Sequence, residues 1–230
     1  MKIALLLCGQ ARFFKDGFES IKKKIIDKYN PDIYIHTWKY KNNYAYSAPW
    51  NYLGKIKIDE NDINEYIDLY KPKKYKIEKS LETIPLKNNY ERTSSKYTKY
   101  NFYCYLYSLN ECYNLIENKS DYDIYIIIRC DVIIYNFPEP NLDYIQLWNR
   151  FPDREEVLET MIVSIPYKFI DIYIDLINNL DIYYEKGYNF NYEEMTHAHF
   201  KEKNLYKDTI KFDRSQFEWG YFRNNRIENI

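Results

Sequence analysis

The sequence contains few glycines and few cysteines, and both shortages exclude common binding motifs. Five glycines occur in 230 residues, and they form neither the repeated-glycine fingerprint of dinucleotide-binding proteins nor a phosphate-binding loop that ends in lysine. The four cysteines include no Cys-x-x-Cys pair, so we expect free buried thiols rather than a zinc cluster. No apolar stretch is long enough to span a bilayer, so we expect no transmembrane segment.

The charge is nearly balanced, and this removes two classes of partner. The net charge is -1 and the sequence pI is about 6.3, so no overall positive field favours nucleic acid or a membrane surface. The unusual residue is tyrosine, which occurs 28 times beside frequent lysine, isoleucine and asparagine. These residues share A/T-rich codons, and codon bias explains most of the excess. A tyrosine-rich surface that stacks on sugars or bases is the alternative.

Alternating strand and helix patterns predict one α/β domain with a mostly parallel sheet flanked by helices. The chain opens with a strand at 2–8, a helix at 15–29 and a strand at 32–38, which is the pattern of a right-handed parallel crossover. Residues 39–58 lack clear periodicity and are expected to form a long loop. The other expected elements are helices at 59–70, 96–117, 166–180 and 191–202, strands at 73–78, 123–134, 143–148 and 160–165, and short strands or loop at 204–230.

The most informative segment is the apolar run 122–134, which reads as a strand buried on both faces and carries Arg129 and Asp131. Burying an unpaired charge is costly, so these two side chains should face each other or a ligand at a strand end. Ligands of open α/β sheets bind outside the carboxyl ends of the strands. There an aspartate can hold a divalent metal and an arginine can hold phosphate or sugar hydroxyls. A structural ion pair is equally well supported by this run alone.

Three other groups should reach the same edge of the sheet. Gly9, Gln10 and Arg12 end the first strand and lead into a helix, where a backbone without a Cβ can approach a phosphate. His36 ends the second strand, and Asn101 lies near the start of the longest predicted helix. Taken singly, each has a structural explanation: a simple turn, a satisfied histidine and an exposed asparagine. Their joint occurrence favours a binding site.

Four of these segments together resemble one group of proteins. The segments are 2–12, 32–38, 101–109 and 122–131, in this order and at this spacing. The chain resembles glycosyltransferases that occur in bacterial surface-polysaccharide clusters and in large DNA viruses. The resemblance covers about the first 135 residues and weakens afterwards.

The resemblance implies a GT-A-like, Rossmann-like fold that uses a nucleoside-diphosphate-sugar as donor and a glycan or other hydroxyl compound as acceptor. It implies that Gly9, Gln10, Arg12, His36 and Asn101 contact or surround the nucleotide. In such folds an Asp-x-Asp motif binds a divalent metal, Mn²⁺ or Mg²⁺, that bridges the donor diphosphate.

In this chain an arginine, Arg129, replaces the first acid of that motif, which leaves Asp131 as the expected metal ligand. Metal dependence is thereby less certain than in the resembled group, because Arg129 could itself neutralise the diphosphate. Either way, the negative charge that develops on the departing nucleoside diphosphate must be stabilised.

The second half, residues 136–230, should supply the acceptor site, while residues 1–135 bind the donor within one domain. Asp153 in a loop and Glu194 on the helix at 191–202 are the candidate catalytic bases; Glu194 is three residues from His197 and so shares a helix face with it. A solvated helix face explains this pair equally well.

We expect a cytoplasmic protein, in the host cytoplasm if the source is viral.

Two alternatives from other functional classes remain open. One is a transferase-derived module that binds nucleotide-sugars without turnover, which the missing first acid favours. The other is a structural protein that interacts through its aromatic surface.

Overall fold

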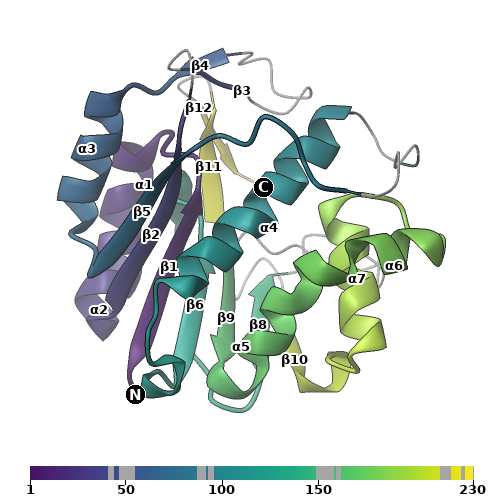
Figure 1. The fold of residues 1–230 in the computed structure, drawn as a ribbon. Helices are drawn as coiled ribbons and strands as arrows, with labels where there is room; N and C mark the ends of the chain where they lie inside the picture. The colour runs from purple at the N-terminus through teal and green to yellow at the C-terminus, as the bar shows by residue number, and fades with distance from the viewer. Residues whose placement is uncertain are drawn as a thin grey trace.

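The chain folds around one central sheet with helices on both faces (Figure 1). The computed structural model describes residues 1–40, 44–46, 55–86, 92, 96–148, 158, 162–212, 219–223 and 226–229. The central sheet has seven strands in the order β10-β8-β9-β6-β1-β2-β5. Their bounds are β1 (Ile3–Gly9), β2 (Asp32–Lys39), β5 (Lys74–Lys79), β6 (Ile124–Ile128), β8 (Ile145–Trp148), β9 (Ile162–Pro166) and β10 (Thr209–Phe212).

Parallel pairing dominates the centre of the sheet, as the opening pattern of the sequence predicts. β1 pairs in parallel with both β2 and β6, and β2 pairs in parallel with β5. β9 departs from this pattern, because it runs antiparallel to β6 and to β8. The sheet is therefore mixed and mostly parallel, and the carboxyl ends of β1, β2 and β6 lie at one edge.

The central strands bury side chains on both faces. Leu5 and Leu7 pack with α1, α2 and α3 on one face, while Leu6 and Cys8 pack with α4 and α5 on the other. This follows from the two-residue period of a strand, and it explains why β6 is apolar throughout. The helices are α1 (Phe14–Ile21), which continues through a π-helical segment (Lys22–Ile26) into α2 (Asp27–Tyr29), α3 (Glu60–Tyr70), α4 (Lys96–Asn114) and α5 (Tyr167–Ile174).

The helices after α5 form a separate apolar cluster with the first half of α4. α6 (Leu180–Glu185) and α7 (Tyr192–Glu202) pack there, and the rings of Phe102 and Phe190 meet edge to face at 5.3 Å. The single helix expected at 166–180 is interrupted, because residues Asp175–Asn179 form a 3-10 segment. The side chain of Asp175 accepts hydrogen bonds from Asn178 and Asn179 within this tighter turn.

The prediction of one strand over 123–134 is wrong. β6 ends at Ile128, residues 129–131 form a turn, and β7 (Val132–Ile134) belongs to a three-stranded sheet with the order β12-β11-β7. Its partner β11 (Trp219–Arg223) is antiparallel to β7 and to β12 (Arg226–Asn229). The turn lets two charged side chains leave the apolar sheet, whereas a continuous interior strand would bury them among isoleucines.

Several smaller features complete the fold. The expected loop at 39–58 contains a two-stranded antiparallel sheet of β3 (Tyr44–Tyr46) and β4 (Lys55–Lys57). Short 3-10 segments lie at Lys119–Asp121 and Tyr206–Asp208. All four cysteines are free, as the sequence predicts. Among the described helices, none has the length and apolar content needed to cross a membrane.

A buried histidine links the C-terminal helices. His199 on α7 donates from Nε2 to the carbonyl oxygen of Ile172 (2.6 Å), and its Nδ1 accepts from the hydroxyl of Tyr183 (2.8 Å). The ring is fully buried, and burial lowers its pKa to about 4. The neutral ring is thus the form that the folded protein holds.

This histidine should make stability depend on pH. Below pH 6.5 the unfolded chain binds a proton at His199 that the folded chain does not bind, so stability falls as pH falls towards 4. Between pH 6.5 and 5 we expect a loss of about 1.5 kcal/mol from this residue. Urea unfolding at several pH values measures this loss. In His199→Gln the free energy of unfolding should depend less steeply on pH. An unchanged pH dependence would refute the assignment.

Candidate functional site

The turn at 129–131 brings one carboxylate against two arginines at the carboxyl edge of the sheet. Asp131 accepts at Oδ1 from Arg129 Nε (2.9 Å) and at Oδ2 from Arg129 Nη2 (2.5 Å) and Arg12 Nε (2.8 Å). These charged side chains lie just beyond the carboxyl ends of two neighbouring parallel strands, since Arg12 follows β1 and the other two follow β6. We call Arg12, Arg129 and Asp131 the triad.

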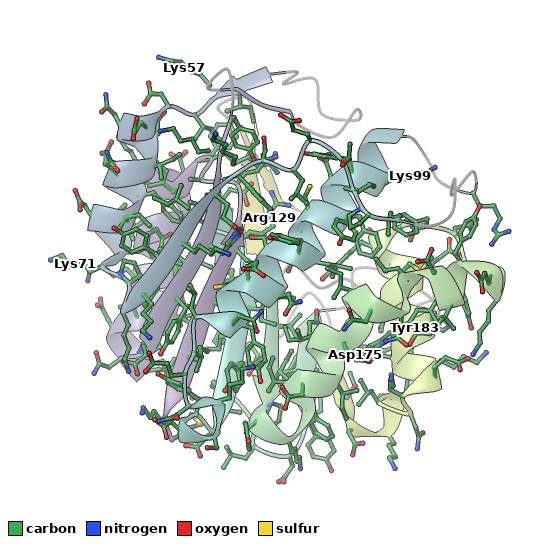
Figure 2. All side chains as sticks on the ribbon, viewed as in Figure 1. Lys57, Lys71, Lys99, Arg129, Asp175 and Tyr183 are labelled. Carbon is green, nitrogen blue, oxygen red and sulfur yellow. The ribbon has the colours of Figure 1, made fainter. Side chains whose placement is uncertain are left out.

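The carboxylate of the triad is more deeply buried than its two arginines. The side chain of Asp131 is 3% exposed, whereas those of Arg12 and Arg129 are 13% and 24% exposed. Burial alone would raise the pKa of Asp131, but the charges of Arg129 and Arg12 outweigh it and hold this pKa below its usual value. The triad is therefore ionised as a whole, with a net charge of +1, and its two arginines are more exposed than its carboxylate. Figure 2 shows Arg129 at the strand ends beside α4, away from Asp175 and Tyr183 in the C-terminal helices.

Backbone contacts hold together the two segments that carry the triad. The Sγ of Cys130 lies 3.3 Å from the carbonyl oxygen of Gln10 and 3.6 Å from that of Arg12, within reach as a donor. Phe13, just before α1, adopts a left-handed conformation with φ 50°, which turns the chain from the strand end into the helix. The Oγ of Ser20 accepts from the amide of Ile134 at 3.0 Å and so fixes α1 to β7.

Gly17 allows α1 to lie directly on the turn. A Cβ at this position would meet the carbonyl oxygen of Cys130 at 2.1 Å and that of Val132 at 2.9 Å. Because both neighbours are backbone atoms, they cannot move aside as a flexible side chain would. A glycine inside a helix is the sequence signal that could have revealed this close approach.

A second chain of hydrogen bonds fixes the end of β1 from the opposite face. Ser108 Oγ on α4 accepts from the amide of Gly9 (2.8 Å) and lies 2.7 Å from Nδ1 of His36, whose Nε2 lies 2.9 Å from Oε2 of Glu78. A carboxylate can only accept, so Nε2 carries the proton and Nδ1 accepts from Ser108. Gly9 itself has a φ of 106°, a conformation that favours glycine.

His36 is buried inside this network rather than exposed at the edge. Its side chain is fully inaccessible, and burial lowers its pKa more strongly than Glu78 raises it, so the ring stays neutral. Lys76 completes the network with ion pairs to Glu78 (2.9 Å) and Glu111 (2.5 Å). His36 therefore positions Ser108 and, through it, Gly9, a role that its place at a strand end did not reveal.

Asn101 lies on the same face of α4 as Ser108 but beyond the end of the sheet. The helix runs from the carboxyl edge to the amino edge, because Ser108 contacts Gly9 while Cys112, one turn later, contacts the carbonyl oxygen of Leu7 at 3.9 Å. Two turns separate Asn101 from Ser108, about 10 Å along the axis. The side chain of Asn101 makes no hydrogen bond to another described residue, and its role in nucleotide contact stays a prediction.

The candidate catalytic bases lie elsewhere. Asp153 is outside the described residues. Glu194 is at the start of α7, where its carboxylate accepts from both Asn189 (2.8 Å) and Asn191 (3.0 Å), and the side chain of Asn191 caps the helix by accepting from the amide of Glu194 (2.8 Å). Burial would raise the pKa of Glu194, but these hydrogen bonds lower it. Its contacts are those of a helix-capping residue, and a catalytic role stays a prediction.

The residues of the triad do not fit a divalent metal. Both oxygens of Asp131 accept from guanidinium groups, and a guanidinium group carries no lone pair to offer a cation. Across the part of the chain that the structure describes, His, Cys, Asp and Glu form no cluster of three or more that could hold a metal ion. Among the described residues, Asp131 therefore belongs to no such cluster, and a metal at this position stays a prediction.

Fold comparison identifies the architecture of the chain. It has a GT-A-like α/β fold, and glycosyltransferases are among the solved structures that it resembles. The structure of the galactosyltransferase LgtC in complex with donor and acceptor sugar analogues has a TM-score of 0.50 and 11% identity, covering 93% of this chain and 74% of that one. An active-site mutant of LgtC gives a TM-score of 0.51 and 13% identity, with 93% and 73% covered.

A viral glycosyltransferase is also similar, at a lower score. It is involved in glycosylation of the major capsid of PBCV-1, and the match has a TM-score of 0.46 and 9% identity over 93% of this chain and 82% of that one. No protein-family model and no curated protein matches the chain. At these identities the comparisons establish the fold, and the function has to be argued from the site.

Gly17→Ala tests the close approach of α1 to the turn. The added methyl group would collide with two carbonyl oxygens, so α1 must shift, at a cost of about 1–3 kcal/mol. We expect the melting temperature to fall by several degrees. Glu19→Ala, an exposed position on the same helix, is the control and should leave it within about a degree. Equal melting of both variants would contradict the proposed packing.

Asp131→Ala tests the triad as a structural unit. The change leaves two guanidinium groups side by side without their counter-ion, and breaking a buried ion pair in this way costs about 3 kcal/mol. We expect a lower midpoint of urea unfolding, whereas Lys28→Ala, which breaks an exposed pair with Glu139, should change the free energy of unfolding by less than about 1 kcal/mol. An unchanged midpoint for Asp131→Ala would mean that the triad contributes no stability.

Proposed function

We propose that the protein is a glycosyltransferase that moves a sugar from a nucleoside-diphosphate-sugar to a hydroxyl group of a glycan or other acceptor. The observation that carries the proposal is the triad, because it presents two guanidinium groups at the carboxyl edge of β1 and β6. This edge is where open α/β sheets bind ligands. The GT-A-like fold supports the same assignment.

The chemistry of sugar transfer explains what the triad would do. As the bond between sugar and diphosphate breaks, negative charge grows on the departing phosphate oxygen, and fixed cations at that point lower the barrier. Arg12 and Arg129 would stabilise this charge, while Asp131 orients both side chains. Gly9 and Gln10 would bring their backbone close to the nucleotide, with His36 holding Gly9 through Ser108.

The acceptor side of the reaction rests on fewer observations. Residues 136–230 would form the acceptor half, and Asp153 or Glu194 would remove the proton from the attacking hydroxyl. Glu194 is held ionised by its asparagine partners, which is the state that a general base requires. Those same partners occupy its oxygens, so Asp153 is the stronger candidate of the two.

A second candidate function is a nucleotide-sugar-binding module without turnover. The arginine at position 129, where a metal-binding acid is expected, favours it. The two functions predict the same binding and differ in whether the sugar–phosphate bond is broken.

A thermal-shift screen with UDP-, GDP-, dTDP- and CMP-sugars tests the proposal. A ligand that binds the folded state raises the melting temperature, by an amount that grows with its concentration relative to the dissociation constant. We expect one nucleotide class to give a shift, and release of free nucleotide from that donor with or without an acceptor to identify an enzyme. No shift with any donor would contradict both functions and favour a structural protein.

A further inference from the structure

The charge balance at the triad differs from that of a metal-binding site. Two guanidinium groups and one carboxylate leave a net charge of +1, so a divalent cation beside them would raise the local charge to +3. An Asp-x-Asp pair would instead be neutralised by the same ion. A divalent cation close enough to bind Asp131 would lie next to the two guanidinium groups, and like charges repel strongly where water is partly excluded. The triad therefore disfavours a metal ion and favours an anion.

Resting on the proposed function, we propose that the donor diphosphate binds directly to Arg12 and Arg129 and that binding requires no divalent metal. The two arginines would take the place of the ion by neutralising the phosphates themselves. Asp131 then keeps both guanidinium groups in place instead of acting as a metal ligand.

The hydrogen-bonding geometry of Arg12 suits this role. It contacts Asp131 through Nε alone, and within the described chain its two terminal nitrogens donate to no other group. A guanidinium group binds phosphate oxygens in pairs through parallel N–H bonds, which a lysine cannot reproduce. Arg12 can therefore hold Asp131 and a phosphate group at the same time.

Contacts outside the triad also hold the two segments that carry its arginines. Gly17 packs on the turn, Cys130 contacts the carbonyl oxygens of residues 10 and 12, and Ser108 holds the amide of Gly9. Because these contacts fix both arginine-bearing segments, little conformational entropy is lost when a phosphate binds. A metal ion is thus not needed to organise the site.

The deciding experiment is calorimetric titration of the purified protein with the nucleoside diphosphates UDP, GDP and dTDP, in EDTA and, separately, in excess Mn²⁺. We expect the nucleotide that binds to do so in EDTA with a dissociation constant within about threefold of its value in Mn²⁺. Binding that appears only with the metal would overturn this inference and leave the proposed function standing. Absence of binding in both conditions would overturn the two together.

Variants test whether the arginines are the ligands. Arg12→Lys keeps the charge but removes the paired N–H groups, and Arg129→Gln removes the charge; each should weaken binding in EDTA by at least about tenfold. Lys28→Gln, which removes a cation at the end of α2, is the control and should bind as the parent does. Unfolding curves of each variant without ligand separate loss of the fold from loss of binding. Unchanged affinity in the folded arginine variants would overturn the inference.

Discussion

The burial of one carboxylate is the constraint on which the candidate site depends. Asp131 can remain ionised under a nearly closed surface only if cations surround it; Arg129 donates to both of its oxygens, and Arg12 adds a second donor to Oδ2. The second arginine, Arg12, lies 119 residues before Asp131 in the sequence. Satisfying one charge thus joins the end of β1 to the end of β6 and gives this edge of the sheet two arginines for one acid.

The apolar framework places these charges through a few close backbone contacts. Helix α1 lies against the turn because residue 17 has no side chain, and α4 reaches the other side of β1 through Ser108. The buried ring of His36 connects that serine to Glu78 on the edge strand β5. Both faces of the sheet therefore contribute to holding one loop, which explains why residues in the core matter to a site at the surface.

Much of the fold could be predicted from the sequence, because strand and helix periods differ clearly in its first half. The strand–helix–strand opening and the long helix α4 follow from the spacing of apolar residues, and the edge that carries Arg12 and Arg129 follows from the parallel order. The break after Ile128 could not be seen, since Val132–Ile134 continues the apolar pattern and only three-dimensional pairing assigns it to another sheet. The antiparallel direction of β9 could not be predicted either, because it too depends on which strands pair in three dimensions.

The partners of individual polar residues were the least predictable part. His36 looks like a ligand-facing group at a strand end, yet its burial depends on Ser108 and Glu78, which are 72 and 42 residues away. Glu194 likewise appears available on a helix face until the two asparagines that hold it are known. Contacts of this kind join distant parts of the chain, and local pattern carries no information about them.

The pairing of β7 has a consequence for how the protein is made. β7 follows the triad directly, but its strand partner β11 begins at residue 219, so these neighbours in space are separated by most of the second half of the chain. Contacts between such distant segments form slowly, because a long loop must close before they contribute any free energy. During synthesis the parallel strands β1, β2, β5 and β6 can pair while β7 still lacks a partner, and the segment beside the triad is completed only when β11 has emerged from the ribosome.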